Sequence, residues 1–224
     1  MHIAKEGWPF ILPPVAAAGA LWTFGRYPWV GASLGLAAFV TWFFRDPARG
    51  FEGPVDLVVA PADGVVTAVD SVLDQEVGPG RMRRIVTFLS AFNVHVQRAP
   101  VSGEVIGSRY KPGRKVAAFR SDAGEVNEYQ LTVLRREEGE IVGVRQLAGL
   151  VARRVVPYLA VGDCIDRGAR LGIIKFGSRV DLMIPESYEV LVSVGDRLVA
   201  GETAVAMPTD PSSPPPDLDD EHVQ

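Results

Sequence analysis

The dipeptide Gly177-Ser178 is the pair of residues with the most distinctive chemistry in this sequence. A glycine carbonyl is the least hindered one that the following serine hydroxyl can attack, and this attack is an N→O acyl shift that opens the peptide bond. Gly-Ser pairs are also common in turns, and Gly107-Ser108 is a second one in this chain. The pair alone therefore leaves both a turn and a self-cleavage site open.

His95 is the only histidine away from the ends of the chain, since the other two are His2 and His222. It lies in the segment Asn93-Val94-His95-Val96-Gln97, where strand alternation places the two valines on one face and the three polar residues on the other. A polar strand face with one imidazole can present a general acid or base, although a lone histidine on a strand is more often structural.

A third candidate, Asp63, lies in the motif Pro61-Ala62-Asp63-Gly64 after a short apolar run. An Asp-Gly pair at the end of a strand is most often a turn, so this motif is weak by itself. The chain has one cysteine, Cys164, and its three histidines are spread over its length. An internal disulfide and a Cys-rich metal site are therefore excluded, and we expect no metal.

The negative net charge of the chain comes from its C-terminal end. The 224 residues include 23 Lys and Arg against 27 Asp and Glu, and residues 208–224 contain several of the acids and no Lys or Arg. The rest of the chain is nearly neutral, which is unlike a nucleic-acid-binding protein, so no such partner is expected. We expect residues 208–224 to be a disordered acidic tail.

The N-terminal segment, residues 1–46, reads as an apolar helical hairpin. Between Gly7 and Phe44 the only charged residue is Arg26, and all four tryptophans of the chain lie there. Two apolar runs, Phe10–Phe24 and Trp29–Phe44, flank a turn at residues 25–28. Sixteen helical residues reach only about 24 Å, which is less than the ~30 Å hydrocarbon core of a bilayer.

Basic residues flank the two apolar runs: Lys5 precedes the first run, and Arg45 and Arg49 follow the second. They favour a hairpin that dips into the membrane with both ends on the cytoplasmic side. A buried soluble hairpin would show a polar stripe, and a signal peptide would not normally be followed at once by a second apolar run. We therefore expect attachment to the cell membrane, peripheral or through the hairpin.

After Pro54 the sequence changes to short β-rich runs separated by Gly, Pro and Asp. Val161-Gly162-Asp163 followed by Gly168 recurs 33 residues later as Val194-Gly195-Asp196 followed by Gly201, which suits tight turns in a barrel-sandwich fold. The fold class expected is mainly β, with one domain over residues 47–207 behind the hairpin. Residues 147–157 fit a short helix or a bulged strand equally well.

Several blocks in this order are similar to those of the phosphatidylserine decarboxylase family, in its short proenzyme form. The run Gly168–Asp181 resembles that family's autocleavage segment. The other blocks are FFRDPAR (43–49), PADG (61–64), FLSAFNVHVQRAPVSG (88–103) and QLAGLVARR (146–154). Several ordered blocks are far more specific than any single motif.

This resemblance implies self-cleavage between Gly177 and Ser178 into a β chain of residues 1–177 and an α chain of residues 178–224. The two chains would form a heterodimer, with a higher oligomer left open. His95 would be the base that activates Ser178, and Asp63 would fix the tautomer of the imidazole. Ser178 would become a pyruvoyl group, the covalent cofactor of the mature enzyme.

The resemblance also implies that the pyruvoyl carbonyl forms a Schiff base with phosphatidylserine in the membrane, and that CO₂ and phosphatidylethanolamine are released. His95 would then serve again as an acid. Arg109 and Lys111 are candidates for the lipid phosphate, against a solvated basic surface. Two other classes stay open: a non-enzymatic membrane-anchored adaptor, and a pyruvoyl decarboxylase of a soluble amino acid.

Overall fold

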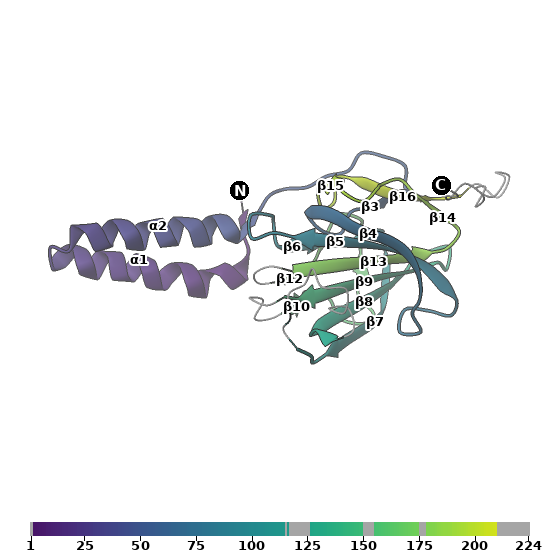
Figure 1. The fold of residues 1–224 in the computed structure, drawn as a ribbon, viewed down its shortest axis with the longest axis horizontal. Helices are drawn as coiled ribbons and strands as arrows, with labels where there is room; N and C mark the ends of the chain where they lie inside the picture. The colour runs from purple at the N-terminus through teal and green to yellow at the C-terminus, as the bar shows by residue number, and fades with distance from the viewer. Residues whose placement is uncertain (1, 115, 117–125, 150–154, 175–177, 210–224) are drawn as a thin grey trace, which may run out of the picture.

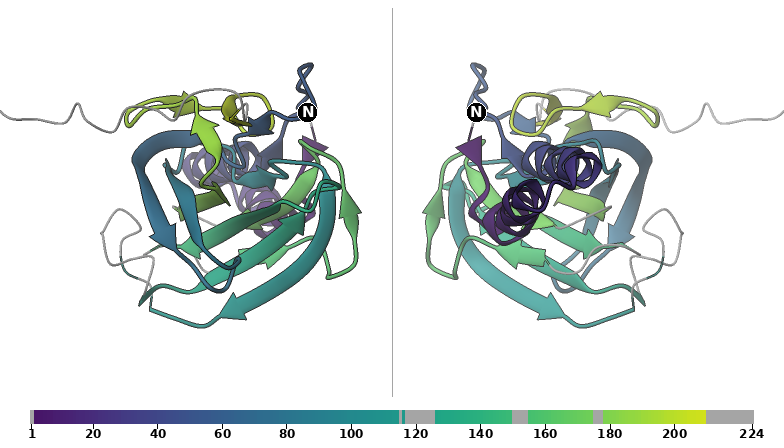
Figure 2. Two further views of the ribbon diagram at one scale, coloured as in Figure 1. Left: turned by 90° about the vertical axis from the view of Figure 1, so that its right-hand side faces the viewer. Right: turned by 90° about the vertical axis from the view of Figure 1, so that its left-hand side faces the viewer.

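A computed structural model describes residues 2–114, 116, 126–149, 155–174 and 178–209. The fold is mainly β, as the sequence predicts, and its body is a strongly curled antiparallel sheet of eight strands (Figures 1 and 2). The strands in spatial order are β11 (Cys164–Ile165), β7 (Gly103–Lys111), β8 (Tyr129–Arg135), β9 (Ile141–Ala148), β13 (Ser178–Pro185), β5 (Arg81–Leu89), β4 (Gly64–Leu73) and β15 (Arg197–Leu198).

Three smaller sheets complete the part of the fold that the structure describes. They are β10 (Val155–Pro157) with β12 (Arg170–Ile174) and β6 (Val96–Arg98); β14 (Tyr188–Val190) with β16 (Ala204–Pro208) and β3 (Val58–Val59); and β1 (His2–Ile3) with β2 (Arg45–Asp46). Residues 155–157 are therefore a strand, whereas residues 150–154 lie outside the described residues. The predicted tail lies outside them from residue 210 onward.

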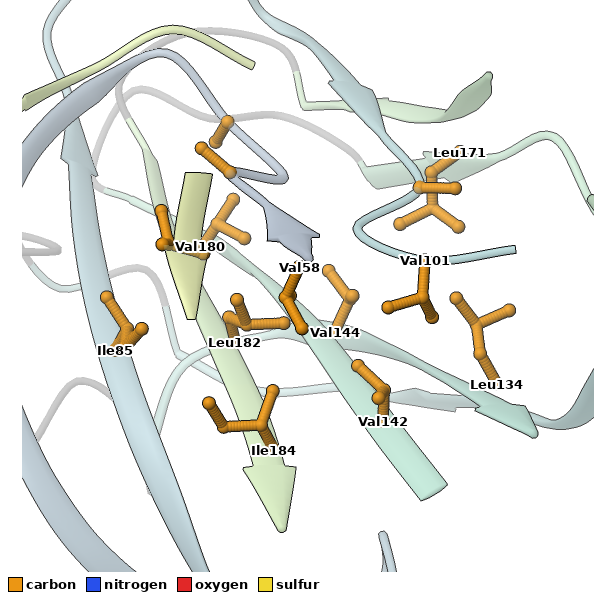
Figure 3. Packing of buried hydrophobic residues seen from close by; sticks show 14 of the residues in the cluster. Val58, Ile85, Val101, Leu134, Val142, Val144, Leu171, Val180, Leu182 and Ile184 are labelled. Atoms are coloured by element: carbon orange, nitrogen blue, oxygen red, sulfur yellow. The ribbon is translucent and has the colours of Figure 1, made fainter. Parts of the chain in front are cut away.

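The main core fills the concave side of the curled sheet. Alternate residues of β13, namely Val180, Leu182 and Ile184, are fully buried there against residues of β9 such as Val144 (Figure 3). Side chains alternate between the two faces of a strand, so Ser178 also points to this inner face. The first residue of β13 thus carries its hydroxyl into the interior of the body.

The recurring V-G-D segments are a matched pair of turns at the two edges of the eight-stranded sheet. Gly162 and Gly195 have positive φ values of 94° and 101°, a conformation that favours glycine. Asp163 and Asp196 each accept a backbone hydrogen bond from the residue three positions earlier, at 2.8 Å. The turns lead into the edge strands β11 and β15. The predicted turn function of the repeat is confirmed.

The N-terminal hairpin consists of α1 (Trp8–Thr23) and α2 (Tyr27–Phe43), preceded by the 3₁₀ turn η1 (Lys5–Gly7). It projects from one end of the body (Figure 1). The predicted hairpin is confirmed, but its turn ends earlier than predicted: Pro28 lies in the first turn of α2, where a proline costs no hydrogen bond. None of the helices in the described residues combines the length and apolar character needed to cross a bilayer.

The base of the hairpin is firmly packed on the body. Phe43 and Phe44 at the end of α2 are buried together with Val94, Val96 and Ile173. The two valines flank His95, and Ile173 belongs to β12, the strand that precedes the segment leading to Ser178. The base of the hairpin therefore packs on the residues that flank His95 and on β12.

Candidate active site

The strand register brings the predicted catalytic segments to one end of the large sheet. Ser178 opens β13 and lies directly opposite Leu89, the last residue of β5, and Ala148, the last residue of β9. Asp63 immediately precedes β4, which pairs with the same end of β5 through Val65. The base of the hairpin and the small sheet of β6, β10 and β12 lie at this end (Figure 1).

Ser178 is completely buried, and its hydroxyl oxygen has no hydrogen-bond partner among the described residues. Leaving a buried hydroxyl without a partner costs about 1–3 kcal/mol, so such groups are rare and tend to occur at functional sites. Gly177, the predicted partner of Ser178 in cleavage, lies outside the described residues.

His95 lies immediately before β6, and its carbonyl accepts a hydrogen bond from the backbone N–H of Ile174 at 3.2 Å. Its Nδ1 is 2.9 Å from the carbonyl oxygen of Asn93. Because a carbonyl can only accept, Nδ1 carries the proton in this contact, and Nε2 has the free lone pair. The Nε2 atom is buried and has no partner among the described residues. It is therefore the atom of His95 that can accept a proton.

Burial keeps this imidazole neutral. Desolvation, the largest cause, lowers the pKa of His95 to about 4, although the contact with Asn93 acts in the opposite direction. The guanidinium charge of Arg45 lowers the pKa further. The ring also packs against Phe43, with ring centroids 4.2 Å apart. The site thus contains a neutral, oriented base close to the base of the N-terminal hairpin.

Asp63 is held by an arginine. It forms a largely buried ion pair with Arg49, whose Nη2 is 3.0 Å from Oδ2, and it accepts a hydrogen bond from the backbone N–H of Ala200 at 2.8 Å. Among the described residues, His95 is not one of its hydrogen-bond or ion-pair partners. The structure instead places the Asn93 carbonyl on Nδ1 of His95. The role of Asp63 in fixing the tautomer stays a prediction.

An internal repeat shows which contact of Asp63 does not require its negative charge. The segment APADG (60–64) has a counterpart in APVSG (99–103), where Ser102 replaces the aspartate. The Ser102 hydroxyl accepts a hydrogen bond from the backbone N–H of Arg167 at 2.9 Å, as Asp63 does from Ala200. An uncharged residue therefore suffices for this contact, and the ion pair with Arg49 is what distinguishes Asp63.

The register does not bring Arg109 and Lys111 to Ser178. Directly opposed residues in an antiparallel sheet share a face, and Lys111 is connected across β8 and β9 to Arg179, the neighbour of Ser178. Lys111 and Arg109 therefore lie on the opposite face from the Ser178 side chain. Arg109 pairs with Glu76 at 3.1 Å, and Lys111 lies over the ring of Tyr129. Their assignment to the lipid phosphate stays a prediction.

Two buried glutamines of the same inner layer were not foreseen from the sequence. Gln146 Nε2 donates to Gln97 Oε1 at 2.8 Å, while Gln97 Nε2 and Gln146 Oε1 have no partner among the described residues. Gln97 lies two residues after His95, and Gln146 lies two residues before Ala148, which is opposite Ser178. The polar face of the NVHVQ segment was the available signal, but it did not identify a partner on β9.

Comparison with known proteins identifies the family of this chain. The family model for phosphatidylserine decarboxylase matches residues 36–206. A phosphatidylserine decarboxylase proenzyme of Symbiobacterium thermophilum is 47% identical over 203 residues, covering 91% of this chain and 94% of the relative. The corresponding proteins of Trichlorobacter lovleyi and Paramagnetospirillum magneticum are 42% and 40% identical, covering 91% of this chain and 95% and 86% of the relatives. The chain belongs to the phosphatidylserine decarboxylase family.

Proposed function

We propose that this chain is a proenzyme that cuts itself between Gly177 and Ser178 and then converts phosphatidylserine to phosphatidylethanolamine and CO₂. The observation that carries the proposal is the pair of buried, unpartnered atoms, Ser178 Oγ and His95 Nε2, at one end of the sheet in a member of this family. A nucleophile and a base are thus both present without competing partners among the described residues.

In the cleavage step, Nε2 of His95 takes the proton of the Ser178 hydroxyl as the oxygen attacks the carbonyl of the preceding glycine, and the proton passes to the amide nitrogen as the C–N bond breaks. The resulting ester is eliminated, which leaves the oxygen on the glycine carboxylate, and hydrolysis with loss of ammonia leaves the pyruvoyl group. The Nδ1 contact with Asn93 keeps the lone pair on Nε2 and stabilises the imidazolium that forms. The buried position of Ser178 at the start of β13 also suits the pyruvoyl group derived from this residue. That group would supply the electron sink that loss of a carboxylate requires.

His95 has a second task after decarboxylation, when a proton must be delivered. A pKa of about 4 in the uncut chain leaves little imidazolium at neutral pH. The negative charge of the substrate carboxylate favours the protonated ring, so binding of substrate raises the pKa of His95. The same residue can therefore be a neutral base in the proenzyme and a proton donor with substrate present.

The pH dependence of self-cleavage follows from the lowered pKa of His95. Its neutral form is the active base, so the cleavage rate is expected to be flat from about pH 5.5 to 8 and to fall about tenfold per pH unit below about pH 4. The measurement is the rate of appearance of two chains after rapid transfer of uncut protein to each pH. A rate that instead falls around pH 6.5, the ordinary pKa of histidine, contradicts a desolvated base.

The two chains are expected to remain together after the cut because the α chain supplies a central strand of the sheet. β13 pairs along its whole length with β5 and also with β9, and both neighbours belong to the β chain. The buried side chains of β13 complete the main core. Separation of the chains would expose this core, which supports a stable heterodimer.

We propose that the hairpin attaches the enzyme to the membrane that contains its substrate. Its large apolar side chains are exposed on both helices, and the most exposed lie near the turn between them: Trp22, Phe24, Tyr27 and Trp29. Monomeric proteins rarely expose such an extended apolar surface to water. The basic residues at the base of the hairpin favour the cytoplasmic leaflet.

Replacing those four tip residues with serine is expected to lower the affinity for phospholipid vesicles by at least about 100-fold, because each aromatic side chain contributes ~1.5–3 kcal/mol when buried. Self-cleavage is expected to be unchanged, since the tip is remote from the site (Figure 1). Vesicle flotation measures binding, and serine at the exposed Val161 and Val194 of the body is the control. Equal flotation of the tip variant and the unaltered protein contradicts the membrane role.

The proposed activity is tested with the purified full chain. Intact mass spectrometry should show two chains, and vesicles of carboxyl-labelled phosphatidylserine should release labelled CO₂. One intact chain without CO₂ release would point to the adaptor, and CO₂ release from a free amino acid but not from the lipid would point to a soluble substrate. The comparisons do not favour either alternative.

A further inference from the structure

Arg45 differs from the other arginines around the base of the hairpin. Arg49 pairs with Asp63, whereas Arg98 and Arg170 both pair with Asp46. The Arg45 guanidinium has no carboxylate within ion-pair distance among the described residues, and it donates only to two backbone carbonyls: Nη1 to Trp42 at 3.0 Å and Nη2 to Phe92 at 2.8 Å. A guanidinium has five N–H donors, so this one keeps donors and a full positive charge for another partner.

The surroundings of Arg45 are those of a membrane interface. Its guanidinium carbon lies 4.0 Å from the ring centroid of Trp42, and this ring is 5.9 Å from that of Phe92. Both aromatic side chains are exposed, and that of Phe92 is 70% exposed although it belongs to the body rather than the hairpin. Aromatic rings with an adjacent arginine are typical of the headgroup level of a bilayer, where phosphates are found.

Arg45 also lies close to the reacting groups. Phe43, two residues earlier, packs on the ring of His95, and the carbonyl that Arg45 holds belongs to Phe92, the neighbour of Asn93 that orients this ring. The effect of Arg45 on the pKa of His95 agrees with this proximity. In phosphatidylserine only a short chain of atoms separates the amine from the phosphodiester. A phosphate held beside the His95 turn would therefore leave the serine part within reach of the interior.

We propose that Arg45, which lies beside the exposed rings of Trp42 and Phe92, binds the phosphodiester of the lipid substrate. The arginine fork matches two phosphate oxygens, and the partly desolvated setting strengthens such a bond. This inference rests on the proposed decarboxylase function. It assigns the phosphate to the face from which the hairpin projects, instead of to Arg109 and Lys111 on the opposite side of the sheet.

The test compares Arg45→Gln with Arg83→Gln. Arg83 is a matched control because it too donates to a carbonyl, that of Glu186, but it lies at the other end of β5. For Arg45→Gln we expect the KM for phosphatidylserine in mixed micelles to rise about 10- to 100-fold, with kcat within about threefold and complete self-cleavage. Calorimetric affinity for glycerophosphoserine, a soluble phosphodiester, should fall by the same factor. Arg83→Gln should change neither quantity.

Two further measurements distinguish a phosphate-binding arginine from one with a purely structural role. Arg45→Lys keeps the charge and should have an intermediate KM, whereas a structural role predicts that both variants lose stability and cleavage without a selective rise in KM. The unaltered enzyme should bind glycerophosphoserine at least about tenfold more tightly than O-methylserine, a ligand without phosphate. This comparison requires no variant, so it tests for a phosphate site even if Arg45→Gln does not fold, and the KM of Arg45→Lys then assigns that site to Arg45.

Equal affinity of the unaltered enzyme for these two ligands overturns the proposal, and so does an unchanged KM in Arg45→Gln. A rise in KM for Arg109→Gln but not for Arg45→Gln would place the phosphate-binding site at Arg109, on the opposite face of the sheet. Failure of the unaltered enzyme to release CO₂ from phosphatidylserine would refute the proposed function instead. The calorimetric comparison would still report on Arg45, so the two failures are distinguishable.

Discussion

The Ser178→Ala protein is expected to remain a single chain of 224 residues and to release no CO₂ from phosphatidylserine. The serine hydroxyl attacks the preceding carbonyl, and elimination of that oxygen from the resulting ester converts the rest of the residue to the pyruvoyl group, so both activities depend on it. The hydroxyl is buried without a partner among the described residues, so its removal breaks no described hydrogen bond. The variant should therefore fold at least as stably as the unaltered proenzyme.

Ser108→Ala is the matched control, because Gly107-Ser108 is the other Gly-Ser pair in the chain. Ser108 lies within β7, and its hydroxyl accepts a hydrogen bond from Gln130. This protein should cut normally. Intact mass spectrometry and thermal unfolding measure cleavage and folding in both variants. If a folded Ser178→Ala protein still gives two chains, the cleavage site is not Gly177-Ser178 and the proposed mechanism is wrong.

The fold class and the hairpin could be predicted because they depend on local patterns. Apolar runs, β-rich segments and the repeated V-G-D turns are properties of neighbouring residues, and the structure confirms them. The turn of the hairpin was predicted too long because Pro28 was assigned to it, although proline also suits the first turn of a helix. Even where the pattern is clear, the exact start of the helix depends on a proline, which suits both a turn and the first turn of a helix.

The contacts of the site depend on long-range pairing, which the sequence does not show. Asp63 and Arg49 lie in different blocks, so their ion pair becomes visible only when β4 and the segment after the hairpin are placed side by side. The orientation of His95 comes from a backbone carbonyl, and every residue type has one. Side-chain motifs therefore identified candidates for nucleophile, base and carboxylate, while the partner of each depends on the fold.

The charge of Asp63 can be tested apart from its structural contact. Asp63→Ser copies Ser102 of the internal repeat, which makes the equivalent backbone hydrogen bond without a charge. If the carboxylate assists the base, this protein should fold but cut more slowly than the unaltered chain. Normal cutting would leave Asp63 with a structural role only, and it would leave the Asn93 carbonyl as the group that orients His95.

The His95→Ala protein is expected to accumulate as uncut proenzyme. Loss of a positioned general base typically slows a reaction by ~10²–10⁴-fold, which turns cleavage during expression into cleavage over days. Among the described residues the other histidine is His2, which is exposed and lies opposite Asp46 in the β1–β2 sheet, so it does not supply a second buried imidazole. Gel analysis of the two chains over time measures the rate.

A structural histidine predicts a different result: its removal would lower stability, and any change in cutting would follow from the lost packing and would not respond to an added proton acceptor. Thermal unfolding therefore accompanies each rate measurement, because the alanine removes a ring that packs on Phe43. Added imidazole can enter the space that the alanine leaves, and it should accelerate cutting of His95→Ala but not of Ser178→Ala. Cutting of His95→Ala at the normal rate would exclude His95 as the base. Cutting that stays slow with imidazole in a protein of reduced stability would assign His95 a structural role, because then the loss of packing, and not of a proton acceptor, explains the defect.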